Sequence, residues 1–144
     1  MARRPDAFFV PRPVPGAEGQ FVVDGTWGHI NPIQLADGVR TVGELEVMAH
    51  IELGLPLVDS RLAHHFADGT IPTAVNIPHT ETTSRLDEVD ATLDTVLFCN
   101  GPQCAATPDA VRQLLDAGFP EASLLYYRGG IHDWMTLGLP VVRP

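Results

Sequence analysis

The sequence predicts an α/β fold, in which a mainly parallel sheet of four to five strands is flanked by helices on both faces. From residue 39 onward, short apolar runs alternate with segments of helical periodicity. Such alternation implies crossover connections, which place neighbouring strands in parallel. The chain has 144 residues, of which 44% are hydrophobic, and this fits a single globular domain. A net charge of −9 argues against nucleic-acid and anionic-membrane partners.

The elements follow from local patterns. Thr41 and Glu44 have capping-box spacing, so we expect a helix after Thr41 that ends near Gly54. Apolar runs predict strands at residues 56–59, 74–77, 95–98 and 123–127. Helical spacing predicts helices at residues 62–67, 84–93 and 130–137. A further helix begins at Thr107-Pro108, with the proline at its first position, and ends at Gly118.

Residues 1–38 differ from residues 39–144, which we take as the folded domain. The first segment is rich in proline and glycine, which predicts an extended arm with one short strand at residues 21–23. Phe8, Phe9, Trp27 and Ile30 are apolar, so we expect the arm to pack on the domain or on a partner subunit, which makes a homodimer possible.

The sequence shows no export signal and no membrane-spanning stretch. Arg3 and Arg4 resemble a twin-arginine signal, but prolines and charges interrupt the apolar stretch that would have to follow them. No window approaches the roughly 18 apolar residues of a membrane-spanning helix. We therefore expect a cytoplasmic protein whose thiols stay reduced.

Polar and reactive residues follow the predicted strands. In a parallel sheet, ligands bind at the carboxyl ends of the strands. Ser60 and Arg61 follow the first run, His79 follows the second, Cys99 follows the third and Arg128 follows the fourth. One edge of the sheet is therefore expected to combine a thiol with two arginines.

The only two cysteines of the chain, Cys99 and Cys104, lie in one loop between a strand and a helix. Backbone N–H groups of such a loop, together with the helix dipole, form an anion site and lower the pKa of a thiol held at its centre. We therefore expect Cys99 to be a nucleophile, with the rest of the loop as the substrate-binding part. That part comprises Asn100, Gly101, Pro102, Gln103, Cys104 and Ala105. The structural alternative is a packed cysteine at a strand end.

Phosphoryl transfer is disfavoured by the loop composition. Phosphatases and arsenate reductases of the Cys-x5-Arg type need an arginine six residues after the cysteine, and Ala105 occupies that position here. The loop also contains no aspartate that could act as a general acid.

Several motifs carry a resemblance to a known family. They are Leu57-Val58-Asp59-Ser60-Arg61, then Gly69-Thr70-Ile71-Pro72-Thr73-Ala74-Val75-Asn76-Ile77-Pro78, then Leu97-Phe98-Cys99, then Tyr127-Arg128-Gly129-Gly130-Ile131 with Trp134, and finally Gly138-Leu139-Pro140-Val141. In this order and spacing the chain resembles the single-domain rhodanese-like sulfurtransferases over about residues 39–143. Residues 1–38 match nothing in that family.

The resemblance implies a sulfurtransferase of the thiosulfate:cyanide type. Cys99 would take a sulfane sulfur from thiosulfate or another persulfide donor and become a persulfide. It would pass that sulfur to cyanide or to a small or protein thiol, with no metal or organic cofactor. Arg61 and Arg128 are then expected to help bind the anionic donor, although Arg61 could instead pair with Asp59.

The sequence departs from the family pattern at three positions. Cys104 stands where the family often has arginine, Thr70 replaces a histidine, and His65 occupies the place of a donor-binding arginine of two-domain members. Cys104 could be an inert loop residue, a resolving thiol that closes a disulfide with Cys99, or a metal ligand together with His79 or His132. The alternative function is a non-catalytic partner-binding or redox-sensing module that uses Cys99 and Cys104.

Overall fold

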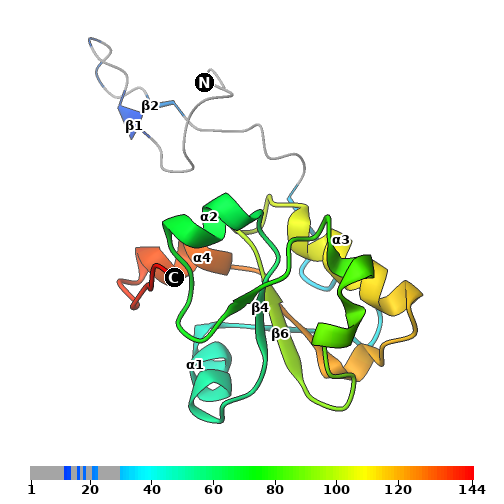
Figure 1. Cartoon of the computed structure of the whole chain (residues 1–144). Coiled ribbons are helices and arrows are strands. Elements are labelled where there is room, and N and C mark those ends of the chain that lie inside the picture. Colours follow the sequence, from blue (N-terminus) through cyan, green and yellow to red (C-terminus); the bar gives the residue numbers. More distant parts are fainter. Residues whose placement is uncertain (1–11, 14–15, 17, 19–20, 23–29) are drawn as a thin grey trace.

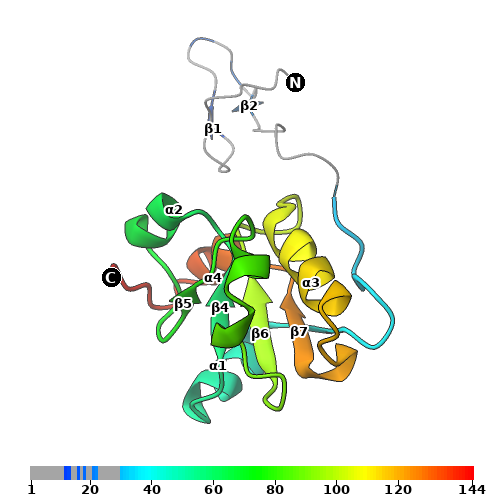
Figure 2. The ribbon, with the colours of Figure 1, turned by 45° about the vertical axis from the view of Figure 1, so that its right-hand side comes forward.

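The computed structural model describes residues 12–13, 16, 18, 21–22 and 30–144. A five-stranded parallel sheet with strand order β3-β7-β6-β4-β5 forms its centre (Figures 1 and 2). The strands are β3 (Arg40–Val42), β4 (Leu57–Asp59), β5 (Val75–Asn76), β6 (Thr95–Phe98) and β7 (Leu124–Tyr127). The helices are α1 (Glu44–Glu52), α2 (Ala63–Asp68), α3 (Ala106–Asp116) and α4 (Gly130–Thr136). The predicted α/β fold is confirmed.

Helices cover both faces of the sheet because the strands are apolar on both sides. One face packs against α3 through a cluster that includes Val58, Leu97 and Leu114. The opposite face packs against α1 and α4 through a cluster that includes Val47, Phe98 and Trp134. Residues of β4, β6 and β7 contribute to both clusters, so these three strands form the buried middle of the sheet.

The start of the first helix differs from the prediction. Thr41 lies in β3, where its hydroxyl donates to the carbonyl of Ile33, so it does not cap the helix. Instead the carboxylate of Glu46 accepts the backbone N–H of Gly43 at 3.0 Å, and α1 begins one residue after Gly43. The predicted cap is therefore wrong, and a strand was missed at the same place.

The predicted helix at residues 84–93 is also wrong. Two short 3₁₀ helices, η1 (Thr82–Ser84) and η2 (Leu86–Glu88), take its place. The carboxylate of Asp90 accepts the backbone N–H of Thr92 at 2.8 Å, which is a local turn that competes with helix formation. A third 3₁₀ helix, η3 (Glu121–Ser123), precedes β7.

The strand predicted at residues 74–77, for which we expected a buried position, is the shorter edge strand β5, and its Val75 is 52% exposed.

The segment before the domain is described only in part. β1 (Arg12–Pro13) pairs with β2 (Phe21–Val22) in an antiparallel manner, which agrees with the strand expected at residues 21–23. Phe8, Phe9 and Trp27 lie outside the described residues, and Ile30 is 65% exposed. Leu35 and Ala36 pack against the core cluster on the α3 side. The boundary between residues 38 and 39, and the homodimer, stay predictions.

Candidate active site

The predicted thiol and the two predicted arginines lie at the carboxyl edge of the sheet. Arg61 follows β4, Cys99 follows β6 and Arg128 follows β7, and β4, β6 and β7 are neighbours in the sheet. The loop from Cys99 to Ala105 leads directly into α3. All of the predicted loop residues, Asn100, Gly101, Pro102, Gln103, Cys104 and Ala105, therefore lie at this edge.

The start of α4 supports the first half of the loop. The backbone N–H of Ile131 donates to the carbonyl of Cys99 at 2.9 Å, and that of His132 donates to the carbonyl of Asn100 at 3.0 Å. Gly130 makes this close approach possible, because its φ is +61° and a Cβ atom there would lie 2.4 Å from the carbonyl oxygen of Cys99. The Gly-Gly motif after β7 thus positions the backbone of the cysteine loop.

The two thiols form a small buried cluster with Ala106. Cys99 is 1% exposed and Cys104 is 7% exposed, and both are free cysteines. The Cys99 Sγ lies 3.6 Å from the backbone carbonyl oxygen of Cys104. The side-chain amide of Asn100 donates to the Cys104 sulfur at 3.8 Å. The loop therefore folds back so that Cys104 shares the site of Cys99.

The electrostatics distinguish the two sulfurs. Burial, followed by the contact with Cys104, raises the pKa of Cys99 well above its usual value. The contact with Cys99 lowers the pKa of Cys104 to about 6, and N–H groups of Ala106 and Asn100 add to this against the effect of burial. The expected lowering of the thiol pKa thus falls on Cys104, chiefly because of its contact with Cys99, and the loop N–H groups add to the effect. These shifts favour the thiol form at Cys99 and the thiolate form at Cys104.

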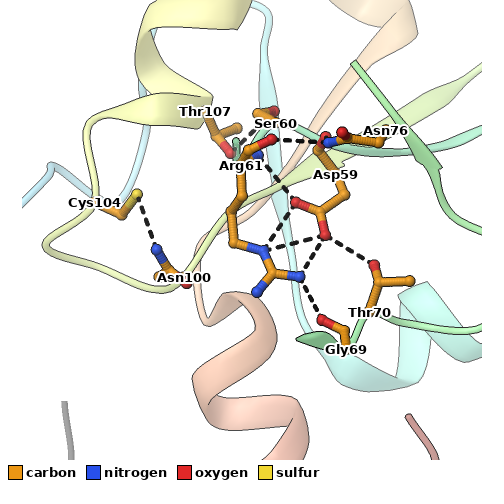
Figure 3. A network of polar contacts seen from close by, with 9 residues as sticks. All are labelled: Asp59, Ser60, Arg61, Gly69, Thr70, Asn76, Asn100, Cys104 and Thr107. Carbon is orange, nitrogen blue, oxygen red and sulfur yellow. Dashed lines mark hydrogen bonds and ion pairs between the residues drawn. The ribbon is translucent and has the colours of Figure 1, made fainter. Parts of the chain in front are cut away.

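Arg61 belongs to a buried polar network with Asp59 (Figure 3). Its Nη2 lies 2.5 Å from Asp59 Oδ2, and its Nε donates to Asp59 Oδ1 at 2.9 Å. The same Nη2 donates to the carbonyl of Gly69 at 2.6 Å, and the hydroxyl of Thr70 donates to Asp59 Oδ2 at 2.8 Å. Figure 3 shows the remaining guanidinium nitrogen, Nη1, pointing away from Asp59. Most of the Arg61 donors are therefore used to hold β4 to the following segment.

Arg128 contacts the segment that precedes the domain. Its Nε and Nη2 donate to the carbonyl of Asn31 at 3.2 and 2.9 Å. Asn31 in turn donates from its backbone N–H to the carbonyl of Pro102 at 2.8 Å, and from its side-chain amide to the carbonyl of Cys104 at 2.7 Å. Arg128 therefore reaches the cysteine loop through Asn31.

A cavity of about 790 Å³ opens next to the loop, between α2, α4 and the C-terminal residues. Residues that line it include Arg61, His65, Asn100, Met135 and Arg143. Burial is the main cause that lowers the pKa of His65, so this side chain is neutral at pH 7. The volume is within the range of small-molecule sites.

The remaining histidine predictions find no support as metal ligands. His79 Nδ1 lies 2.9 Å from the carboxylate of Asp109 on α3. Within the described residues, no group of three or more His, Cys, Asp or Glu side chains could hold a metal ion. No helix among them is long and apolar enough to cross a membrane.

Two residues near the thiols escaped the sequence prediction as site residues. Asn31 lies 73 positions before Cys104, and no motif marks it; only the expectation that the arm packs on the domain points there. Thr107 was predicted as a helix cap, but α3 begins at Ala106, and the fully buried Thr107 hydroxyl faces Ser60 Oγ at 3.4 Å. The Thr107 hydroxyl and backbone N–H also lie near Cys99, where they favour its thiolate and oppose the rise of its pKa.

The chain is similar in sequence or in fold to several known proteins. The chain is 39% identical over 97 residues to the HTH-type transcriptional regulator Rv0324 of Mycobacterium tuberculosis; the match covers 67% of this chain and 42% of that regulator. It is 34% identical over 88 residues to a sulfurtransferase of Allochromatium vinosum, covering 61% of this chain and 78% of that protein. The crystal structure of a rhodanese-related protein from Thermoplasma volcanium superposes with a TM-score of 0.60 at 24% identity, covering 73% of this chain and 99% of the other.

The family model for the rhodanese-like domain matches residues 42–137, which include β4, the whole cysteine loop and α4. The matched region spans most of the chain and every strand of the five-stranded sheet except the start of β3. The chain therefore belongs to the rhodanese-like domain family.

Proposed function

We propose that the protein is a sulfurtransferase that moves a sulfane sulfur from an anionic donor to a thiophilic acceptor through a persulfide on Cys99. The position of Cys99 carries the proposal: it directly follows the central strand β6 and begins the loop that leads into α3. The family and the sulfurtransferase relative support the same chemistry. The donors are thiosulfate or another persulfide, and the acceptors are cyanide, a small thiol or a protein thiol. The cycle needs reduced thiols, as in the cytoplasm.

The first half-reaction uses both cysteines. The Cys104 thiolate accepts the proton of the Cys99 thiol, which makes Cys99 nucleophilic despite its raised pKa. The Cys99 sulfur then attacks the sulfane sulfur of thiosulfate. A Cys99 S–S bond forms, the bond between the sulfane sulfur and the sulfonate sulfur breaks, and sulfite leaves with the electron pair. The hydroxyl and backbone N–H of Thr107 stabilise the anionic sulfur.

The second half-reaction returns the enzyme to its starting state. An acceptor thiolate or cyanide attacks the outer sulfur of the persulfide, and the bond between that sulfur and Cys99 breaks. Cys99 leaves as a thiolate and recovers its proton from Cys104. Because Cys99 is 1% exposed, the loop must open to admit both donor and acceptor.

Intact-protein mass spectrometry after incubation with thiosulfate tests the proposal. Wild-type protein should gain about 32 Da, the mass of one sulfur atom, and Cys99→Ser should not. Cys104→Ser is the matched control from the same loop, and it should still gain the adduct, with a rate that rises only at more alkaline pH. Sulfur transfer that survives in Cys99→Ser would refute the role of Cys99.

The paired thiols also favour a second candidate function, a redox-sensing module. Both sulfurs are buried in one cluster, and Cys104 carries the thiolate that would attack an oxidised Cys99. This function predicts that mild oxidant closes a Cys99–Cys104 disulfide, with a loss of about 2 Da, while thiosulfate leaves no adduct. The same mass spectra therefore distinguish the two functions.

A further inference from the structure

Asn31 lies outside the region that matches the family, yet its backbone and its side chain both bind the cysteine loop. It binds two loop carbonyls, those of Pro102 at 2.8 Å and of Cys104 at 2.7 Å. Its own carbonyl accepts two hydrogen bonds from Arg128, at the end of β7. Asn31 thus connects the second half of the loop to the residue that follows β7.

We propose that Asn31 is a positioning residue for the sulfur-transfer reaction, which holds the loop from Pro102 to Cys104 in place and sets the polarity around Cys99. The proposal rests on the proposed function only for the catalytic readout. Its structural content, the control of the loop and of the two thiols, is independent of the reaction.

The carbonyl of Cys104 is the link between Asn31 and the chemistry. This oxygen accepts the Asn31 amide on one side and lies 3.6 Å from the Cys99 Sγ on the other. A carbonyl oxygen beside a sulfur favours the protonated thiol and disfavours an anionic thiolate or persulfide. By donating to the same oxygen, the Asn31 amide withdraws part of its negative charge. Asn31 therefore eases formation of the anionic forms of Cys99.

The second effect is mechanical. The backbone N–H of Asn31 fixes Pro102, its side chain fixes Cys104, and Arg128 holds Asn31 itself. These bonds close the part of the loop that covers Cys99, which is 1% exposed. Removing the side chain leaves the Cys104 carbonyl, among the described residues, with only the weak S–H donor of Cys99, so the loop opens more often. Arg128, which the sequence predicted as a donor-binding residue, then acts by holding Asn31.

The test compares Asn31→Ala and Asn31→Asp with wild-type full-length protein. The matched control is Gln34→Ala, because Gln34 is an exposed polar residue of the same segment whose side chain makes no hydrogen bond among the described residues. Steady-state sulfur transfer is measured against pH. In parallel, the rates at which iodoacetamide modifies Cys99 and Cys104 are measured separately by peptide mass spectrometry.

We expect Asn31→Ala to raise the alkylation rate of Cys99 about tenfold and to lower kcat about tenfold, with KM changing less, because one buried hydrogen bond is lost. Asn31→Asp keeps the size and the backbone bonds but replaces the donor with a negative charge, so its kcat–pH profile should move further to alkaline pH than that of Asn31→Ala. Gln34→Ala should behave as wild type.

Wild-type alkylation rates and pH profiles in both Asn31 variants would overturn the proposal. Equal effects from Gln34→Ala would also overturn it, because they would show a general loss of stability in this segment. If the protein transfers no sulfur at all, the proposed function fails, while the alkylation rates still decide the role of Asn31.

Discussion

The thiol pair gives the sharpest prediction, because each sulfur sets the protonation of the other. The largest cause of the low pKa of Cys104, about 6, is its contact with Cys99. Cys99→Ala removes that donor and leaves the N–H groups of Ala106 and Asn100, against which burial acts to raise the pKa. The pKa of Cys104 should therefore rise from about 6 towards the usual value of a cysteine.

The assay is the pH dependence of alkylation. In Cys99→Ala, Cys104 is the only cysteine of the chain, so the rate of iodoacetamide modification between pH 5 and pH 10 reports its thiolate fraction alone. In the wild type, peptide mass spectrometry isolates the same rate, which should reach half its maximum near pH 6. Cys99→Ser keeps a hydroxyl donor and should give an intermediate midpoint. A midpoint that is the same in wild type and Cys99→Ala would refute the coupling between the two thiols.

Three further predictions concern stability and the loop backbone. The folded-state pKa of Cys104 is about 6, below that of the unfolded thiol, so the unfolding free energy of wild type should rise with pH from about 6 to about 9. Cys104→Ser should lose this rise in urea titrations at several pH values. Asp59→Asn leaves the guanidinium of Arg61 without its charge partner, so the free energy of unfolding measured in urea should fall by about 3–5 kcal/mol. A decrease below about 1 kcal/mol would contradict the structural role of the pair. Gly130→Ala places a Cβ atom 2.4 Å from the carbonyl oxygen of Cys99 and displaces the loop. This variant should therefore form no sulfane-sulfur adduct in the mass spectrum. An adduct at the wild-type level would show that the loop tolerates the displacement.

The strands that build the site were predictable, because each has a strong local signal. Strands β4, β6 and β7 are apolar on both faces, which only the middle of a parallel sheet requires. β3 was missed, because its three residues, Arg40–Val42, run from exposed to buried and Thr41 mimics a helix cap. The α3 cap was misplaced for a related reason: Thr107 has the residue type of a cap, but its hydroxyl faces the site.

The position of the two cysteines on one loop was predictable, but their electrostatics were not. Two cysteines on one strand-to-helix loop are visible in the sequence, and the structure places both at one site. Burial is the main cause that raises the pKa of Cys99, and the contact with Cys99 is the main cause that lowers the pKa of Cys104. Neither pKa shift can be predicted from the neighbouring residues in the sequence. The same is true of Asn31, whose contacts join residues 73 and 97 positions apart in the chain.

Val141 and Arg143 form one wall of the 790 Å³ cavity. How firmly this wall is held affects how tightly the cavity can bind a small molecule. Val142 is held by a single isolated bridge to Thr70, and Arg143 by one bond from its Nε to the carbonyl of Asp68 at 3.1 Å. A segment held by so few hydrogen bonds opens more readily than a strand within a ladder. A molecule that needs this wall binds only the fraction of the protein whose tail is docked, so its apparent dissociation constant scales inversely with that fraction. Changes to the last few residues would thus tune occupancy of the cavity without touching either cysteine.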